Sequence, residues 1–94
     1  MPTAPLTDKE TRRRTTGGGE RYHVILYNDD VNDFDHVIVT LMQVVGVDQN
    51  SAVAIAYTAH NFGTAIAATT HKEHAEAYRE GLENAGLTAT IEPA

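Results

Sequence analysis

The chain of 94 residues contains no cysteine and no tryptophan, and its only serine is Ser51. Without cysteine it has neither a disulfide framework nor a thiolate metal site, so burial of apolar surface must stabilise the fold. The lone serine is not part of a Gly-x-Ser-x-Gly elbow, which together with the lack of cysteine argues against a nucleophilic hydrolase. We therefore expect a protein without catalytic residues rather than an enzyme.

Long apolar segments are also missing. No run approaches the roughly 20 apolar residues that a membrane-spanning helix needs. Near the N-terminus, charged side chains stand where a signal peptide would have its apolar stretch. These absences predict a cytoplasmic protein without membrane contact.

Basic side chains are scarce in most of the chain. Residues 22–94 hold two of them against ten acidic ones, whereas residues 1–21 hold five against three. An acidic body repels phosphate backbones, so nucleic acid is not an expected partner. The basic run Arg12 to Arg14 could contact an acidic surface, although a solvated tail is the simpler interpretation.

The chain divides into an arm and a core. Residues 1–21 are rich in Thr, Pro, Arg and Gly, include the run Gly17 to Gly19, and have almost no large apolar side chain. Such a segment buries too little surface to offset the entropy of ordering, which predicts a flexible N-terminal arm. Residues 22–94 form the predicted core domain.

Apolar spacing predicts the elements of the first half of the core. A β-branched and aromatic strand over 22–27 runs into a polar turn. A helix over 34–45 follows, with Asn32 as its expected N-cap and Gly46 at its end. Its inward row should comprise Phe34, Val37, Ile38, Leu41, Met42 and Val45.

The second half begins with a helix capped by Asp48 and ended by Gly63, followed by a strand over 64–69. The inward row of this helix should comprise Ala52, Ile55, Ala56, Ala59 and Phe62. Thr70 and Glu73 are spaced as a capping box for a third helix, which Gly86 ends before a strand over 87–92. The order β-α-α-β-α-β predicts an α+β fold, a small three-stranded antiparallel sheet with three helices packed on one side.

Two patterns that could bind a cofactor are weak. His71 and His74 lie one helical turn apart, but two ligands do not make a closed metal site. Gly17 to Gly19 are consecutive, precede a strand and lack a following Lys-Ser or Lys-Thr, unlike a phosphate-binding loop. We expect neither a metal nor another cofactor.

The remaining constellation is the polar turn Asn28, Asp29, Asp30 and Asn32, together with His60 near the end of the second helix. Ordinary turn, cap and helix-dipole roles account for all of them on composition alone. The alternative is a site for an α-ammonium group, whose three N–H donors and positive charge require several acceptors. Apolar side chains available to line a recess beside it are Leu26, Phe34, Val37, Ala56, Ala59 and Leu87.

Several of these segments together resemble one protein family. The run from Val24 to Asp30 ends a strand in Leu-x-Asn-Asp-Asp, and His60 follows some 30 residues later in a His-x-x-Gly setting. Combined with Thr90-Ile91-Glu92 at the end, this pattern closely resembles the ClpS adaptor family over residues 22–94. The resemblance implies a monomeric adaptor that recognises N-degrons, substrates whose first residue is bulky and hydrophobic.

The resemblance also implies partners and residue roles. The adaptor would deliver substrates to ClpA or ClpC, the AAA+ unfoldases of the Clp protease, with its N-terminal arm engaging the unfoldase pore. Positions matching Asn28, Asp29 and His60 would hold the α-amino group, and Glu73 would lie on the unfoldase-binding face. The positions that would surround the first side chain match Phe34, Val37, Ala56, Ala59 and Leu87. Asp30, Asn32 and Leu26 complete the expected substrate-binding turn and pocket.

The chain departs from the family pattern in its pocket. The family usually has Thr-Pro-Met where this chain has Asn32, Asp33 and Phe34, and commonly a methionine at the position of Ala56. The smaller alanine releases space, so a broader set of first residues, including Ile or Val, is expected unless Phe34 fills the gap.

Two other functions remain open. A ribosomal-stalk-like interaction module shares the small α+β architecture, although such a domain is typically rich in lysine and this core has only Lys72 and Arg79. A hydrolase using Asp29 and Asp30 as acid and base with His60 would need side chains that converge to about 3 Å, and adjacent residues on a turn point in different directions.

Overall fold

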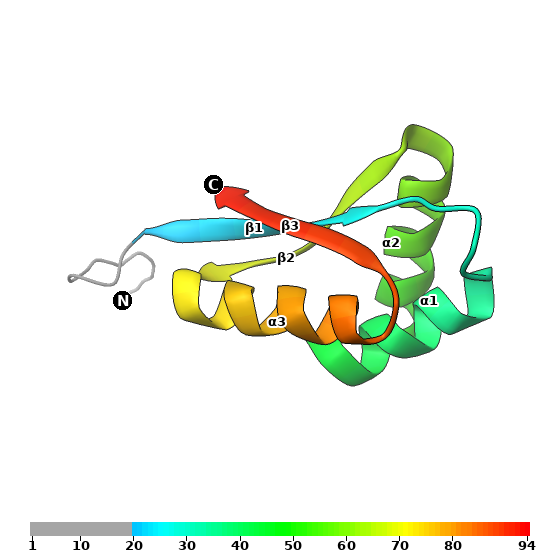
Figure 1. The fold of residues 1–94 in the computed structure, drawn as a ribbon, viewed down its shortest axis with the longest axis horizontal. Coiled ribbons are helices and arrows are strands. Elements are labelled where there is room, and N and C mark those ends of the chain that lie inside the picture. Colours follow the sequence, from blue (N-terminus) through cyan, green and yellow to red (C-terminus); the bar gives the residue numbers. More distant parts are fainter. Residues whose placement is uncertain (1–19) are drawn as a thin grey trace.

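The computed structural model describes residues 20–94. This part of the chain forms three strands, three α-helices and one π-helical segment. Their order is β1 (Arg21–Tyr27), α1 (Phe34–Thr40), η1 (Leu41–Val45), α2 (Gln49–Phe62), β2 (Thr64–His71), α3 (Lys72–Asn84) and β3 (Thr88–Pro93). This order confirms the predicted α+β fold (Figure 1). Residues 1–19, most of the predicted arm, lie outside the described part.

The sheet is antiparallel, and β1 lies between β2 and β3. Side chains alternate along β1, so Val24 and Leu26 are buried while Tyr27 is partly exposed on the other face. The register with β2 shifts between Val24 and Ile25, which is a β-bulge. The buried face of β1 is therefore the one that points toward the helices.

The helices cover one face of the sheet, with α3 running beside all three strands and α1 and α2 gathered at one end (Figure 1). Alanine dominates the core between these layers, so helices and strands approach closely. The buried apolar residues are Val24, Leu26, Leu41, Ala52, Ala56, Ala59, Ala65, Ala67, Ala75, Leu82, Leu87 and Ala89. No helix within residues 20–94 has both the length and the apolar character needed to cross a bilayer.

The first helix begins at Phe34 as predicted, but its N-cap lies one residue later than expected. Asp33, not Asn32, is the N-cap of α1, and its carboxylate accepts a hydrogen bond of 2.8 Å from the backbone N–H of His36. The prediction for Asn32 was wrong because its side chain is engaged with Asp29 instead. Of the predicted inward row, Phe34 and Met42 are both exposed by more than a third.

The predicted helix over 34–45 changes geometry at Leu41, where α1 gives way to the π-helical η1. Gly46 ends it as expected, in the left-handed region at φ 84°. The segment packs closely against α3, because a Cβ on Gly81 would lie only 2.7 Å from Cγ1 of Val44. Gly81 therefore permits this approach through its lack of a side chain.

Both predicted ends of the second helix are confirmed. Asp48 accepts a hydrogen bond of 2.8 Å from the backbone N–H of Ser51, and Gly63 follows the last turn at φ 92°. Ala59 is buried as expected, but Phe62 is 81% exposed. The expectation for Phe62 was wrong because the helix continues one turn beyond its last buried residue.

The predicted capping box of the third helix is also wrong. His71 is the N-cap of α3 and makes no capping hydrogen bond with its side chain. Thr70 lies in β2, where it pairs with Tyr22 of β1, so strand pairing places it too early to cap the helix. Gly86 ends α3 as expected, at φ 91°.

Candidate functional site

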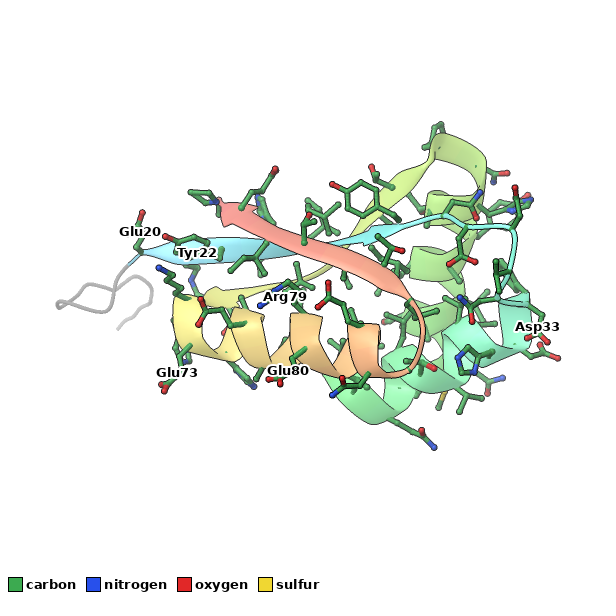
Figure 2. The ribbon with its side chains drawn as sticks, viewed as in Figure 1. Glu20, Tyr22, Asp33, Glu73, Arg79 and Glu80 are labelled. Carbon is green, nitrogen blue, oxygen red and sulfur yellow. The ribbon has the colours of Figure 1, made fainter. Side chains whose placement is uncertain are left out.

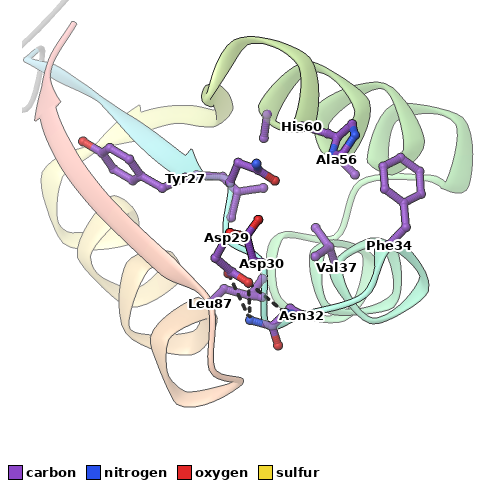
Figure 3. Close-up of a pocket in the computed structure, with 12 residues that line it drawn as sticks. Tyr27, Asp29, Asp30, Asn32, Phe34, Val37, Ala56, His60 and Leu87 are labelled. Atoms are coloured by element: carbon purple, nitrogen blue, oxygen red, sulfur yellow. Dashed lines mark hydrogen bonds between the residues drawn. The ribbon is translucent and has the colours of Figure 1, made fainter.

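A pocket of about 260 Å³ opens where the end of β1 meets α1 and α2. One side of its lining is polar and the other apolar (Figure 3). The lining residues are Leu26, Tyr27, Asn28, Asp29, Asp30, Asn32, Phe34, Val37, Ala56, Ala59, His60 and Leu87. The pocket thus joins hydrogen-bonding groups to an apolar recess.

Every residue that the sequence suggested for the α-ammonium site and its recess lies in this lining. They come from five separate elements or loops, which the fold brings together. Tyr27, which directly precedes Asn28 at the end of β1, also lines the pocket, and the sequence did not predict it. Its hydroxyl points away from the pocket and lies 3.2 Å from Oγ1 of Thr90 (Figure 3).

The end of α2 is fastened to the end of β1. The backbone N–H of Asn28 donates to the carbonyl of Gly63 over 2.9 Å, and the N–H of Gly63 donates to Ala59 over 2.8 Å. The second bond closes the last turn of α2, and the first holds that turn against the strand. His60 is therefore held beside the polar turn despite its separation in sequence.

The carboxylate of Asp29 is held by its neighbours in the turn. Its Oδ1 accepts hydrogen bonds from the backbone N–H groups of Val31 (2.9 Å) and Asn32 (2.8 Å). The amide of Asn32 adds contacts of 3.2 Å to Oδ1 and 3.0 Å to Oδ2, drawn as dashed lines in Figure 3.

These bonds act on the charge of Asp29. The backbone bond from Asn32, followed by its side-chain bond, lowers the pKa of the Asp29 carboxyl below its usual value. Partial burial opposes this effect, while the Val31 N–H and the nearby His36 support it. Because each donor stabilises the ionised form, Asp29 is a fixed negative charge at neutral pH.

The apolar wall is formed by α1, α2 and the loop after α3. Phe34 and Val37 face Ala56 across the recess, and Leu87 closes its lower end in Figure 3. Phe34 is 39% exposed, so it stands at the opening rather than in the core. The small side chain of Ala56 leaves space beside it.

The charge of the pocket has one sign. Its lining includes the carboxylates of Asp29 and Asp30, and residues 20–94 contribute no lysine or arginine to it. Within this part of the chain, a cation that enters the site meets acceptors and negative charge. The arrangement favours a small positively charged group attached to an apolar one.

The last predicted site residue, Glu73, lies elsewhere. It is exposed in the first turn of α3, at the opposite end of the molecule from Asp33 at the start of α1 (Figure 2). His71 and His74 are near it, with ring centroids 5.5 Å apart. Within residues 20–94 no cluster of three or more potential metal ligands occurs.

Comparison with known proteins points to one family. Residues 18–90 match the family model described as ATP-dependent Clp protease adaptor protein ClpS. The ATP-dependent Clp protease adapter protein ClpS of Synechococcus elongatus is 45% identical over 74 residues, which are 78% of each chain. The adapter protein ClpS of Gloeobacter violaceus is 38% identical over 94 residues, covering 99% of this chain and 98% of the relative.

A solved structure is similar as well. The structure of Agrobacterium tumefaciens ClpS2 bound to L-phenylalaninamide superposes with a TM-score of 0.73 at 31% sequence identity. The match covers 80% of this chain and 98% of the Agrobacterium chain. The ligand of that relative combines a free amino group with an aromatic side chain.

Proposed function

Because the chain belongs to the ClpS family of Clp protease adaptors, we propose that its pocket binds the free N-terminal residue of protein substrates. The observation that carries this proposal is the meeting of the Asn28, Asp29 and His60 side chains with an apolar recess. The polar groups would hold the α-ammonium group, and the recess would hold the first side chain.

The chemistry of an amino terminus suits these acceptors. An α-ammonium group has three N–H donors, which match an amide oxygen of Asn28, the carboxylate of Asp29 and a neutral ring nitrogen of His60. Hydrogen bonds to a charged group contribute about 1.5–3 kcal/mol each. The charge also separates a free amino terminus from an internal peptide segment.

The recess suits a bulky apolar first residue. Phe34, Val37, Ala56, Ala59 and Leu87 offer only carbon atoms from their side chains. Burial of apolar surface contributes about 25 cal/mol per Å², so a large first side chain adds more affinity than a small one. We infer that N-degrons with bulky hydrophobic first residues are the substrates.

The same features argue for binding rather than hydrolysis. The lowered pKa of Asp29 makes it a weak base at neutral pH and leaves no proton to donate. A general acid needs the opposite shift. The carboxylate therefore serves better as a permanent partner for a cation.

Delivery requires a second surface. We infer that the protein presents bound substrates to the unfoldase ClpA or ClpC as a monomer in the cytoplasm. Exposed Glu73, at the far end of α3, would contact the unfoldase while the pocket stays open (Figure 2). A Glu73→Ala variant should then lose unfoldase binding but keep peptide affinity.

A matched pair of variants tests the proposed site. Asp29 and Asp48 both accept bonds from backbone N–H groups, and the pKa of both carboxyls is lowered, but only Asp29 lines the pocket. Asp29→Ala should weaken binding of a Phe-initiated peptide by tenfold or more. A tenfold loss of affinity corresponds to about 1.4 kcal/mol of binding free energy. Asp48→Ala should bind as the wild type does. Equal affinity of all three proteins would contradict the proposed site.

A further inference from the structure

We propose that Asn32 is a positioning residue, which orients the Asp29 carboxylate so that an acceptor site on its Oδ2 remains for the substrate amine, and which links the two sides of the pocket. The proposal rests on the proposed function, because the amine is the ligand of that site. Asn32 acts through Asp29 and through the turn after α3.

The two oxygens of the Asp29 carboxylate accept different numbers of hydrogen bonds. Oδ1 accepts from the N–H of Val31 (2.9 Å), the N–H of Asn32 (2.8 Å) and Nδ2 of Asn32 (3.2 Å). Among the described residues 20–94, the donor to Oδ2 is Nδ2 of Asn32, at 3.0 Å. A carboxylate offers about two acceptor sites on each oxygen. Oδ1 is therefore filled, and the remaining capacity lies on Oδ2.

The second observation fixes which atom of the Asn32 amide faces the carboxylate. Nδ2 also lies 2.9 Å from the carbonyl oxygen of Gly86. Both partners are acceptors, so only the NH₂ group satisfies them, and the amide has one productive orientation. One N–H is directed to Asp29 and the other to Gly86.

The third observation is where the Gly86 carbonyl comes from. The N–H of Gly86 donates to Glu83 (2.9 Å) and that of Leu87 to Leu82 (3.0 Å), which closes the end of α3. Gly86 has φ 91°, a conformation that glycine adopts without strain. The turn thus sets both the acceptor for Asn32 and the next residue, Leu87, in the pocket lining.

Asn32 consequently connects the polar turn after β1 with the apolar wall of the recess. The side chain of His36 makes a parallel attachment, donating from Nε2 to the carbonyl of Ala85 over 2.9 Å. Only the Asn32 attachment includes the Asp29 carboxylate among its acceptors. Its loss should therefore affect amine recognition more than it affects apolar contact.

The Asn32→Asp substitution separates a positioning role of Asn32 from a simple effect of charge. Asn32→Asp keeps the shape of the side chain but replaces the NH₂ group by an oxygen that faces two acceptors. An added negative charge beside an ammonium site should strengthen binding, whereas a displaced Asp29 carboxylate should weaken it. The sign of the change separates the two explanations.

The experiment compares Asn32→Asp and Asn32→Ala with Asn61→Asp. Asn61 is exposed beside His60 and does not line the pocket, so it receives the same chemical change without the same contacts. Each protein is titrated with a Phe-initiated peptide and with its acetylated form. Asn32→Asp should weaken free-amine binding by about tenfold or more and Asn32→Ala by about threefold, in line with loss of a hydrogen bond. The acetylated peptide should be little affected, and Asn61→Asp should match the wild type.

A second readout needs no peptide. Carbon-13 NMR titration of the Asp29 carboxyl should show a higher pKa in Asn32→Ala than in the wild type, because the N–H that Asn32 directs to both carboxylate oxygens is lost. Unchanged amine discrimination in both Asn32 variants, or an unchanged Asp29 pKa, would overturn the positioning role while leaving N-terminus binding intact. If the wild type itself bound both peptides equally, the proposed function would fail, and the NMR titration would still decide whether Asn32 controls Asp29.

Discussion

The ring of Phe34 meets the imidazole of His60 edge-on, with ring centroids 6.4 Å apart and planes at 85°. The contact joins α1 to α2 at the opening of the pocket. It also places an aromatic ring next to one of the groups proposed to hold the amine. The apolar and polar parts of the site therefore share a boundary, and a substrate's first residue would meet both at once.

The space beside Ala56 should determine which first residues are accepted. Ala56→Met adds three heavy atoms to the recess, and a buried methylene corresponds to about 0.8 kcal/mol. We expect the wild type to accept Ile-initiated peptides and Ala56→Met to weaken them by one to two orders of magnitude relative to Leu. Titration with Leu-, Phe-, Trp- and Ile-initiated peptides measures this. The same ranking in both proteins would mean that Phe34 already fills the space.

The ring nitrogen of His60 should contribute to amine binding, because the proposed site uses it as one of three acceptors. His60→Gln should bind a Phe-initiated peptide more weakly than the wild type at neutral pH. Titration of both proteins with the free and the acetylated peptide measures this. Equal affinity of the two proteins for the free peptide would remove His60 as an acceptor.

The contribution of Asp29 to stability should disappear in acid. Its pKa is lower in the folded protein, so its stabilisation is fully present above the ordinary aspartate pKa of about 3.9. That stabilisation is lost as the pH falls through the lowered value. Urea unfolding of the wild type and Asp29→Ala should show a difference at pH 7 that shrinks below pH of about 4. A difference that is independent of pH would indicate a packing effect.

Gly81→Ala should destabilise the fold although alanine is the better helix former by about 1 kcal/mol. The added Cβ would lie 2.7 Å from Cγ1 of Val44, and such overpacking typically costs about 1–3 kcal/mol. Thermal unfolding of Gly81→Ala, Val44→Ala and the double variant forms a complete cycle. The double variant should be more stable than the sum of the single effects implies. Additive effects would contradict the close contact.

Local patterns predicted most of the fold because they are set by neighbouring residues. Strand alternation, the caps at Asp48 and the glycine ends at Gly46, Gly63 and Gly86 depend on nearby backbone groups, and all of them appear in the structure. The two caps that were predicted wrongly, Asn32 and Thr70, depend on distant partners. Thr70 pairs with Tyr22 in the sheet instead of capping α3.

Within the site, the sequence predicted which residues gather but not how they bond. Asn32 and Asp33 are both good capping residues, and spacing alone does not tell which of them caps α1. The choice depends on Asp29 and on the carbonyl of Gly86, 54 residues away, both of which bind the Asn32 amide. A contact of that kind appears only when the chain is folded.

The most direct measurement of the central claim is fluorescence anisotropy of a Phe-initiated peptide beside the same peptide acetylated at its amine. Acetylation removes the charge and two of the three donors and leaves the side chain unchanged. Since a hydrogen bond to a charged group contributes about 1.5–3 kcal/mol, the account predicts a loss of affinity of at least about tenfold to a hundredfold. Equal affinity for the two peptides would contradict N-terminus recognition by this pocket.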